Sequence, residues 1–235
     1  MMQPTVSKWP KVVPALTQAQ EEAREAWMML WHEQLPNKFG VVEKFNHGFP
    51  AGLPVRAESK TLEVGPGIGG HLEYEGLAKQ EYSVLEYREE FCKRLAEQLS
   101  QARVHQGSIE ERQVFADGAF DRVIAILVLE HLRNLPAALD EIDRLLSRDG
   151  VFDIVLPCEG GLAYDFARRI SSKRMFEKHF AMSYDPIIRA EHVNTLAEVK
   201  QELFKRFRLE RRAHFPLLIP VDTINLCVGY RLKHL

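Results

Sequence analysis

The stretch TLEVGPGIGG, residues 61–70, is the feature that most constrains the fold of this chain. Its first residues are mainly apolar or β-branched and predict a short buried strand, and four glycines follow within six positions. Glycine adopts backbone angles that a side chain forbids, so such a turn can bring bare backbone N–H groups close to a ligand. We therefore expect a strand, a glycine loop and a helix over residues 70–80, whose N-terminus would favour negative charge.

The spacing within and after the loop narrows the class of ligand. The pattern E-x-G-x-G-x-G begins at Glu63 and lacks the lysine of G-x-x-x-x-G-K-[ST] loops, which disfavours a triphosphate site. Glu86 ends the run YSVLE and follows Glu63 by 23 residues, close to the spacing of about 20 residues between a glycine loop and a ribose-binding acid. A nicotinamide dinucleotide site is the alternative, although Pro66 and the G-x-G-x-G spacing fit its fingerprint less well.

The run LEVGPGIGG resembles the first motif of the class I S-adenosylmethionine-dependent methyltransferases, and VLEH, residues 128–131, resembles a sequence common in their small-molecule type 11 group. The resemblance implies S-adenosylmethionine as the cofactor. Ser108 stands where the family often has an aspartate that accepts from the adenine amino group, and its hydroxyl can also accept, while Ile109 can pack on the ring. The implied cofactor-binding residues are Glu63, Gly65, Gly67, Gly69, Glu86, Ser108, Ile109, Leu127 and Glu130.

His131 is the candidate catalytic residue. Ligands of open α/β sheets bind beyond the carboxyl ends of the strands, so the resemblance places Glu130 and His131 beside the transferred methyl group. An imidazole there can accept the proton of a hydroxyl or amine nucleophile. The alternative is a structural cap on the cofactor pocket, because methyl transfer depends mainly on alignment. The sequence leaves both roles open.

Strands and helices alternate from residue 58 onward, which predicts an α/β fold with a parallel sheet. The resemblance implies a Rossmann-like, doubly wound, seven-stranded mixed sheet, and the two late runs FRLERRAHF and TINLCVGYRL predict an antiparallel C-terminal hairpin. Residues 58–235 would form this methyltransferase domain. The expected elements are strands at 82–86, 103–106, 120–131 and 151–157, helices at 88–100 and 136–147, and a turn at Asp149-Gly150.

Two segments lie outside this alternation. Residues 1–57 predict an arm and an amphipathic helix covering the site; the helix would run from the N-cap Thr17 to Pro36, and its two tryptophans would pack on the sheet or form a lid. Residues 45–54 predict a turn-rich linker. A helical insertion at about 158–205, with a helix at 195–205, would cover the substrate. The expected substrate contacts are His47, Tyr184 and His192.

Composition excludes several classes of function. The chain has 31 basic and 33 acidic residues, a net charge of −2, which argues against nucleic-acid binding. Its one dense basic cluster, within residues 205–212, predicts a solvated strand edge or helix end. Three scattered cysteines and the absence of H-E-x-x-H predict reduced thiols and no metal site. The lack of a signal sequence and of a bilayer-length apolar run predicts a cytoplasmic protein without a membrane span.

These observations predict S-adenosylmethionine-dependent methyl transfer to an O, N or C nucleophile of a small molecule, in metabolite or saccharide biosynthesis. Two alternatives remain: a methyltransferase acting on RNA or protein, and a non-catalytic module that binds S-adenosylmethionine. The sequence leaves the acceptor atom and the oligomeric state open.

Overall fold

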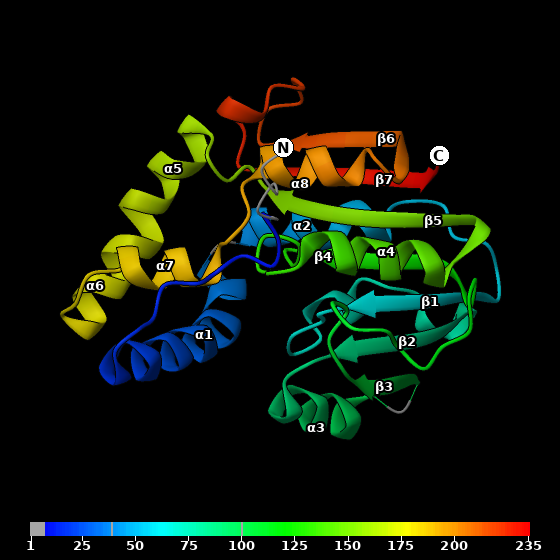
Figure 1. Ribbon diagram of the computed structural model, residues 1–235, viewed down its shortest axis with the longest axis horizontal. Helices are drawn as coiled ribbons and strands as arrows, with labels where there is room; N and C mark the ends of the chain where they lie inside the picture. The colour runs from blue at the N-terminus through cyan, green and yellow to red at the C-terminus, as the bar shows by residue number, and fades with distance from the viewer. Residues whose placement is uncertain (1–7, 39, 100) are drawn as a thin grey trace, which may run out of the picture.

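The computed structural model describes residues 8–38, 40–99 and 101–235 and is built around a seven-stranded sheet of order β3-β2-β1-β4-β5-β7-β6 (Figure 1). The first five strands are parallel, and β7 is antiparallel to both of its neighbours. This arrangement confirms the predicted doubly wound fold with an antiparallel hairpin. The strands are β1 (Ser59–Val64), β2 (Gln80–Glu86), β3 (Ala102–Gln106), β4 (Phe120–Ile126), β5 (Leu146–Pro157), β6 (Phe207–Phe215) and β7 (Cys227–His234).

Helices cover both faces of the sheet because the central strand β4 is apolar on both sides, with Val123 and Ile124 fully buried. One face packs on α4 and α8, and the other on α2 and α3. Among the described residues, no helix has the length and apolar character to cross a bilayer. The helices are α1 (Gln18–Lys38), α2 (Gly40–Ala51), α3 (Glu89–Gln98), α4 (Leu135–Leu145), α5 (Leu162–Arg168), α6 (Arg174–Phe180), α7 (Asp185–Glu191) and α8 (Leu196–Leu203).

Several predicted elements differ in the structure. The helix expected over residues 70–80 is wrong: two short 3₁₀ turns, Gly70–Glu73 and Leu77–Lys79, stand in its place. The linker expected at 45–54 lies largely in α2, because Phe45 and Phe49 recur at helical spacing and pack against the sheet.

Three further boundaries move. The first helix, α1, continues through Pro36 to Lys38. Strand β4 ends at Ile126, five residues before the predicted end, because the backbone turns at the left-handed Leu127. The turn expected at Asp149-Gly150 is absorbed into the long strand β5 at an irregularity of its pairing with β4.

The tryptophan-bearing helix α1 packs on the insertion rather than on the sheet. The Trp27 ring lies 5.5 Å from the Phe176 ring and 6.2 Å from that of Tyr184, centroid to centroid. The expected packing against the sheet is therefore wrong. Helix α8, by contrast, buries Val199 and Leu203 in the core beside α4, so the insertion that stands outside the sheet layers ends at about residue 194.

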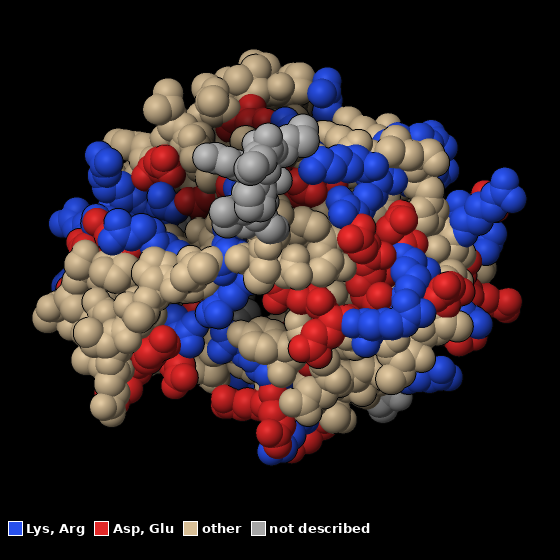
Figure 2. Space-filling model, in the orientation of Figure 1, with Lys and Arg blue, Asp and Glu red and all other residues tan. Residues whose placement is uncertain are grey.

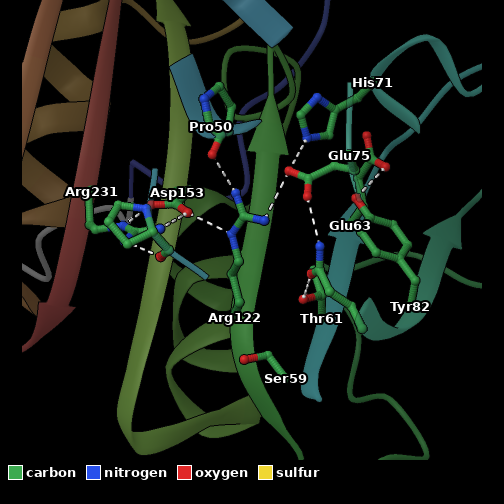
Figure 3. A network of polar contacts seen from close by, with 12 residues as sticks. Pro50, Ser59, Thr61, Glu63, His71, Glu75, Tyr82, Arg122, Asp153 and Arg231 are labelled. Atoms are coloured by element: carbon green, nitrogen blue, oxygen red, sulfur yellow. Dashed lines mark hydrogen bonds and ion pairs between the residues drawn. The ribbon is translucent and has the colours of Figure 1, made fainter. Parts of the chain in front are cut away.

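A buried ionic network joins the strands at the centre of the sheet (Figure 3). Asp153 on β5 accepts from Arg122 Nε on β4 and from Arg231 Nε and Nη2 on β7, each at 2.7 Å. Arg122 also donates to the Pro50 carbonyl at 2.7 Å and to Glu75 at 2.9 Å. Burial alone would raise the pKa of Glu75, but hydrogen bonding by His71 and the charge of Arg122 lower it to about 2.

We expect Asp153→Asn to lower the free energy of unfolding by about 3 to 5 kcal/mol, because two buried guanidinium groups would lose their shared counter-charge. Urea denaturation measures this loss. The matched control is Asp140→Asn: Asp140 is 67% exposed and pairs with Arg206 at the surface, so its loss should cost less than about 1 kcal/mol. Equal effects of the two substitutions would contradict the central role of the network.

Candidate functional site

The glycine loop follows β1 at the carboxyl edge of the sheet. Gly65, Gly67 and Gly69 have φ angles of 63°, 58° and 88°, which side chains rarely adopt. A Cβ on Gly65 would also lie 2.8 Å from a methyl group of Val128 in the segment after β4. The loop therefore requires glycine for both its conformation and its packing. A short 3₁₀ turn, Gly70–Glu73, follows the loop in place of an α-helix.

Glu86, at the end of β2, is tied to this loop. Its Oε2 accepts from the Gly67 N–H at 3.3 Å and its Oε1 from the Arg88 N–H at 2.9 Å. The side chain is buried, and burial raises its pKa although these backbone hydrogen bonds oppose the rise. The loop and the acid predicted from their spacing thus form one unit, suited to a hydroxylated ligand.

Glu63 lies inside strand β1, before the glycine loop. Its side chain is buried and accepts a hydrogen bond from the Tyr82 hydroxyl at 3.0 Å (Figure 3). Burial raises its pKa. Ser108 follows β3, and its hydroxyl accepts from the Glu110 N–H at 3.3 Å; Ile109 is buried in the main core. The polar side chains of Glu63 and Ser108 are thus each hydrogen-bonded within the protein.

The segment after β4 combines backbone strain with a buried acid. Leu127 has a φ of 54°, an unusual value for a leucine. Glu130 is 3% exposed, burial raises its pKa to about 7, and its Oε2 has no hydrogen-bond partner among the described residues. The Glu130 carbonyl accepts from the N–H groups of Val193 and Asn194, at 2.9 and 3.0 Å. The strand end is thereby fastened to the insertion.

Two histidines meet at this junction. His131 lies edge-on to His192, with ring centroids 4.9 Å apart, and its Nδ1 is 2.9 Å from the Glu191 carbonyl. Nδ1 of His192 is 2.8 Å from Glu159 Oε2. Arg168 forms an ion pair with Glu159. Burial alone would raise the pKa of Glu159, but His192 and Arg168 lower it.

Sequence reasoning missed the roles of Glu159 and Arg168. Each stands outside any recognisable motif, and only the turn from β5 into α5 and the fold of the insertion bring them to His192. Loss of hydration lowers the pKa of His131, although 38% of its side chain is exposed. The junction therefore presents two neighbouring imidazoles, one of them backed by an ionised carboxylate.

Of the other expected substrate residues, His47 lies beside the glycine loop, and Tyr184 lines a cavity together with Arg168 of the junction. His47, on α2, is 3.0 Å from Glu43 and stacks on His71 beside the glycine loop. Tyr184 is buried in the aromatic cluster with Trp27 and lines a cavity of about 210 Å³ within the insertion. Among the described residues, no cluster of acidic, histidine or cysteine side chains could hold a metal ion.

Residues 62–154 match a family model described as a methyltransferase domain. No curated protein matches the sequence. Many solved structures share the fold, among them the following three. A SAM-dependent methyltransferase from Aquifex aeolicus has 15% identity and a TM-score of 0.58, over 85% of this chain and 98% of the other. The CurJ carbon methyltransferase has 17% identity and a TM-score of 0.59, and the match covers 92% of this chain and 59% of the other. The third structure is a complex between the Haloferax volcanii Trm112 methyltransferase activator and a methyltransferase. The matching chain has 12% identity and a TM-score of 0.58, and the match covers 94% of this chain and 99% of the other.

The raised pKa of Glu130 predicts a stability change with pH. Since the folded-state pKa of about 7 exceeds the ordinary 4.5, the contribution is fully present below about pH 4.5 and is lost as pH rises through about 7. Relative to Glu130→Gln, the wild type should lose about 3 kcal/mol of stability across this interval. Chemical denaturation at several pH values measures it. Glu90→Gln, at an exposed position, should keep the wild-type dependence; a pH-independent difference between wild type and Glu130→Gln would contradict the assignment.

Proposed function

We propose that this chain, a class I S-adenosylmethionine-dependent methyltransferase of the type 11 group with its domain signature at residues 62–154, methylates an O, N or C nucleophile of a small molecule. One observation supports this proposal most. The glycine loop with Glu86, and the neighbouring imidazoles of His131 and His192, lie at the same edge of the sheet. The edge thus offers a cofactor subsite beside a subsite for the acceptor.

The described residues fit the cofactor. The backbone N–H groups of the loop and the Glu86 carboxylate would hold its methionine and ribose portions, and Ser108 and Ile109 would contact adenine. The unpartnered Oε2 of Glu130 is a buried polar atom that a bound ligand would satisfy. When bound, S-adenosylmethionine supplies an electrophilic methyl group on a sulfonium. The protein aligns the acceptor with that methyl group and excludes water.

The insertion and α1 form the proposed cover of the acceptor subsite. Helices α5, α6 and α7 follow β5 directly, and the Trp27 cluster fixes α1 against α6 and α7. Hydrogen bonds from Val193 and Asn194 to the Glu130 carbonyl hold the end of the insertion at the site. A covered subsite favours a small acceptor over a polymer.

A proton acceptor is present in the pair of imidazoles. His131 was the candidate from sequence, and Glu191 and Glu130 lie 3.6 and 3.9 Å from its ring nitrogens, but the hydrogen-bonded carboxylate belongs to His192. Glu159 Oε2 at Nδ1 orients the His192 ring and leaves Nε2 to take the proton of the nucleophile. His131 would then line the subsite and hold the Glu191 carbonyl. We favour His192 as the base for this reason.

Surface charge speaks against a nucleic-acid substrate. Basic and acidic side chains are interspersed over the face in Figure 2, and the basic cluster of residues 205–212 lies at the exposed edge strand β6, as predicted. A non-catalytic module is less favoured, because it would have no use for a buried acid beside paired imidazoles.

The cofactor assignment is tested by calorimetric titration with S-adenosylhomocysteine. Glu86→Ala should weaken binding by about 1 to 3 kcal/mol, the usual effect of losing a charge-assisted hydrogen bond. The control is Glu81→Ala on the same strand, where the side chain is exposed and binding should be unchanged. An unaltered dissociation constant in Glu86→Ala would remove Glu86 from the site.

The base is tested with the acceptor that a methyl-transfer screen identifies. His192→Asn should lower kcat by about 100-fold and abolish the limb of the pH profile near the histidine pKa, with cofactor affinity retained. Glu159→Gln should also lower kcat, by less than His192→Asn, because the imidazole ring loses the carboxylate that orients it. His131→Asn should keep the limb. Loss of the limb in His131→Asn alone would return the role to His131.

A further inference from the structure

A group of exposed apolar side chains lies beyond the site, on α5 and on the loop between β6 and β7. Leu162, Phe166 and Ile170 recur at helical spacing on α5 and the turn after it, and are 79%, 63% and 57% exposed. Leu218, in the loop, is 90% exposed. We call the whole group the apolar rim. Its members are Leu162, Phe166, Ile170, Leu217, Leu218, Ile219, Val221 and Ile224.

The two parts of the rim form one surface at the edge of the sheet that carries the site. The N-terminus of α5 lies against the loop, since a Cβ on Gly161 would be 3.1 Å from the Asp222 carbonyl oxygen. Strand β6 is antiparallel to β7, which is antiparallel to β5. The loop after β6 therefore leaves the sheet at the same edge as the glycine loop. Figure 1 shows α5 and this loop next to each other.

The loop is held in a fixed shape by a buried asparagine. Asn225 Oδ1 accepts from the Leu217 N–H at 2.8 Å, and its Nδ2 donates to the carbonyls of Ile219 and Val221, each at 2.9 Å. Prolines at positions 216 and 220 have no N–H to satisfy. These hydrogen bonds pair one N–H and two carbonyls within the loop, so the apolar side chains project from a fixed backbone.

Positive charge accompanies the rim. Arg169, Arg174 and Lys178 follow α5, are exposed, and have no acidic partner within 4.0 Å in the part of the chain that the structure describes. Nearby acids are already paired: Asp165 with Arg168 at 3.0 Å and Asp185 with Lys173 at 2.6 Å. Basic side chains accordingly gather around α5 at the upper left of Figure 2.

We infer that this edge of the molecule docks on an anionic membrane surface, with the apolar rim in the interfacial layer and the three basic side chains at the headgroups. Apolar burial combined with basic charge is the combination that holds peripheral proteins on anionic lipids. The rim is rich in Leu, Ile and Val and has no Trp or Tyr, whereas protein interfaces concentrate their binding energy in Trp, Tyr and Arg.

Membrane docking would also define the acceptor. If the proposed function holds, the site opens toward the lipid surface, and the acceptor is an amphiphile that a membrane presents, with its polar nucleophile reaching the imidazoles. Vesicle binding needs neither cofactor nor acceptor, so its outcome is independent of the calorimetric test of cofactor binding.

The test is sedimentation of the full chain with large unilamellar vesicles of phosphatidylcholine containing phosphatidylglycerol, compared with phosphatidylcholine alone. We expect binding to the mixed vesicles that weakens as salt rises. The double variant Leu218→Ser, Ile219→Ser should bind at least about tenfold more weakly. Arg169→Gln combined with Arg174→Gln should lower binding by at least about fivefold and remove most of the preference for phosphatidylglycerol.

The control is Val114→Ser, which replaces an apolar side chain that is 95% exposed but lies outside the rim and should leave vesicle binding unchanged. Circular dichroism melting checks that each variant is folded. Two results would overturn the inference: no sedimentation with mixed vesicles, or sedimentation that the rim variants do not reduce. A dimer in size-exclusion chromatography that dissociates in the Leu218→Ser, Ile219→Ser variant, without vesicle binding, would instead assign the rim to contact between two copies.

Discussion

The carboxylate of Asp153, shared by two buried guanidinium groups, is the interaction on which the rest of the structure depends. It joins the three strands at the centre and C-terminal half of the sheet, and Arg122 extends the join to α2 and to Glu75. A buried charge is tolerated only with its partners in place, so the network admits one register of these strands. Glu75 belongs to the segment after the glycine loop, and its ion pair accompanies 3₁₀ turns rather than a helix there.

The candidate site lies beyond the carboxyl ends of these strands, where the chain is less regular. Three glycines and Leu127 adopt left-handed backbone angles within the loops that follow β1 and β4, a concentration of strain that is common at functional sites. Buried Glu130 and the two imidazoles lie where the second of these loops meets the insertion. The rigid sheet positions these loops, and the loops carry the candidate functional residues, as in other open α/β folds.

The insertion connects the chemistry to the surface. Its inner side supplies Glu159 and His192 to the site, its aromatic residues fix α1, and its outer side supplies three of the eight residues of the apolar rim. A single segment can therefore determine both which acceptor binds and the surface at which the protein encounters it. The net charge of −2 does not reveal the local positive charge near α5, because acidic residues elsewhere in the chain balance it.

The sequence by itself determined the fold class, the strand–glycine loop unit and the pairing of that loop with Glu86. These depend on local patterns: apolar runs, glycines at fixed offsets and one β-α-β spacing. The tertiary structure alone decided the partners of buried charge and the contents of the insertion. Asp153 finds Arg231 across 78 residues, and His192 finds Glu159 across 33. Such pairs have no periodicity, because strand order and helix packing set their separation. For the same reason α2 formed where turn residues predicted a linker: the burial of Phe45 and Phe49 outweighed the weak helix propensity of glycine and proline.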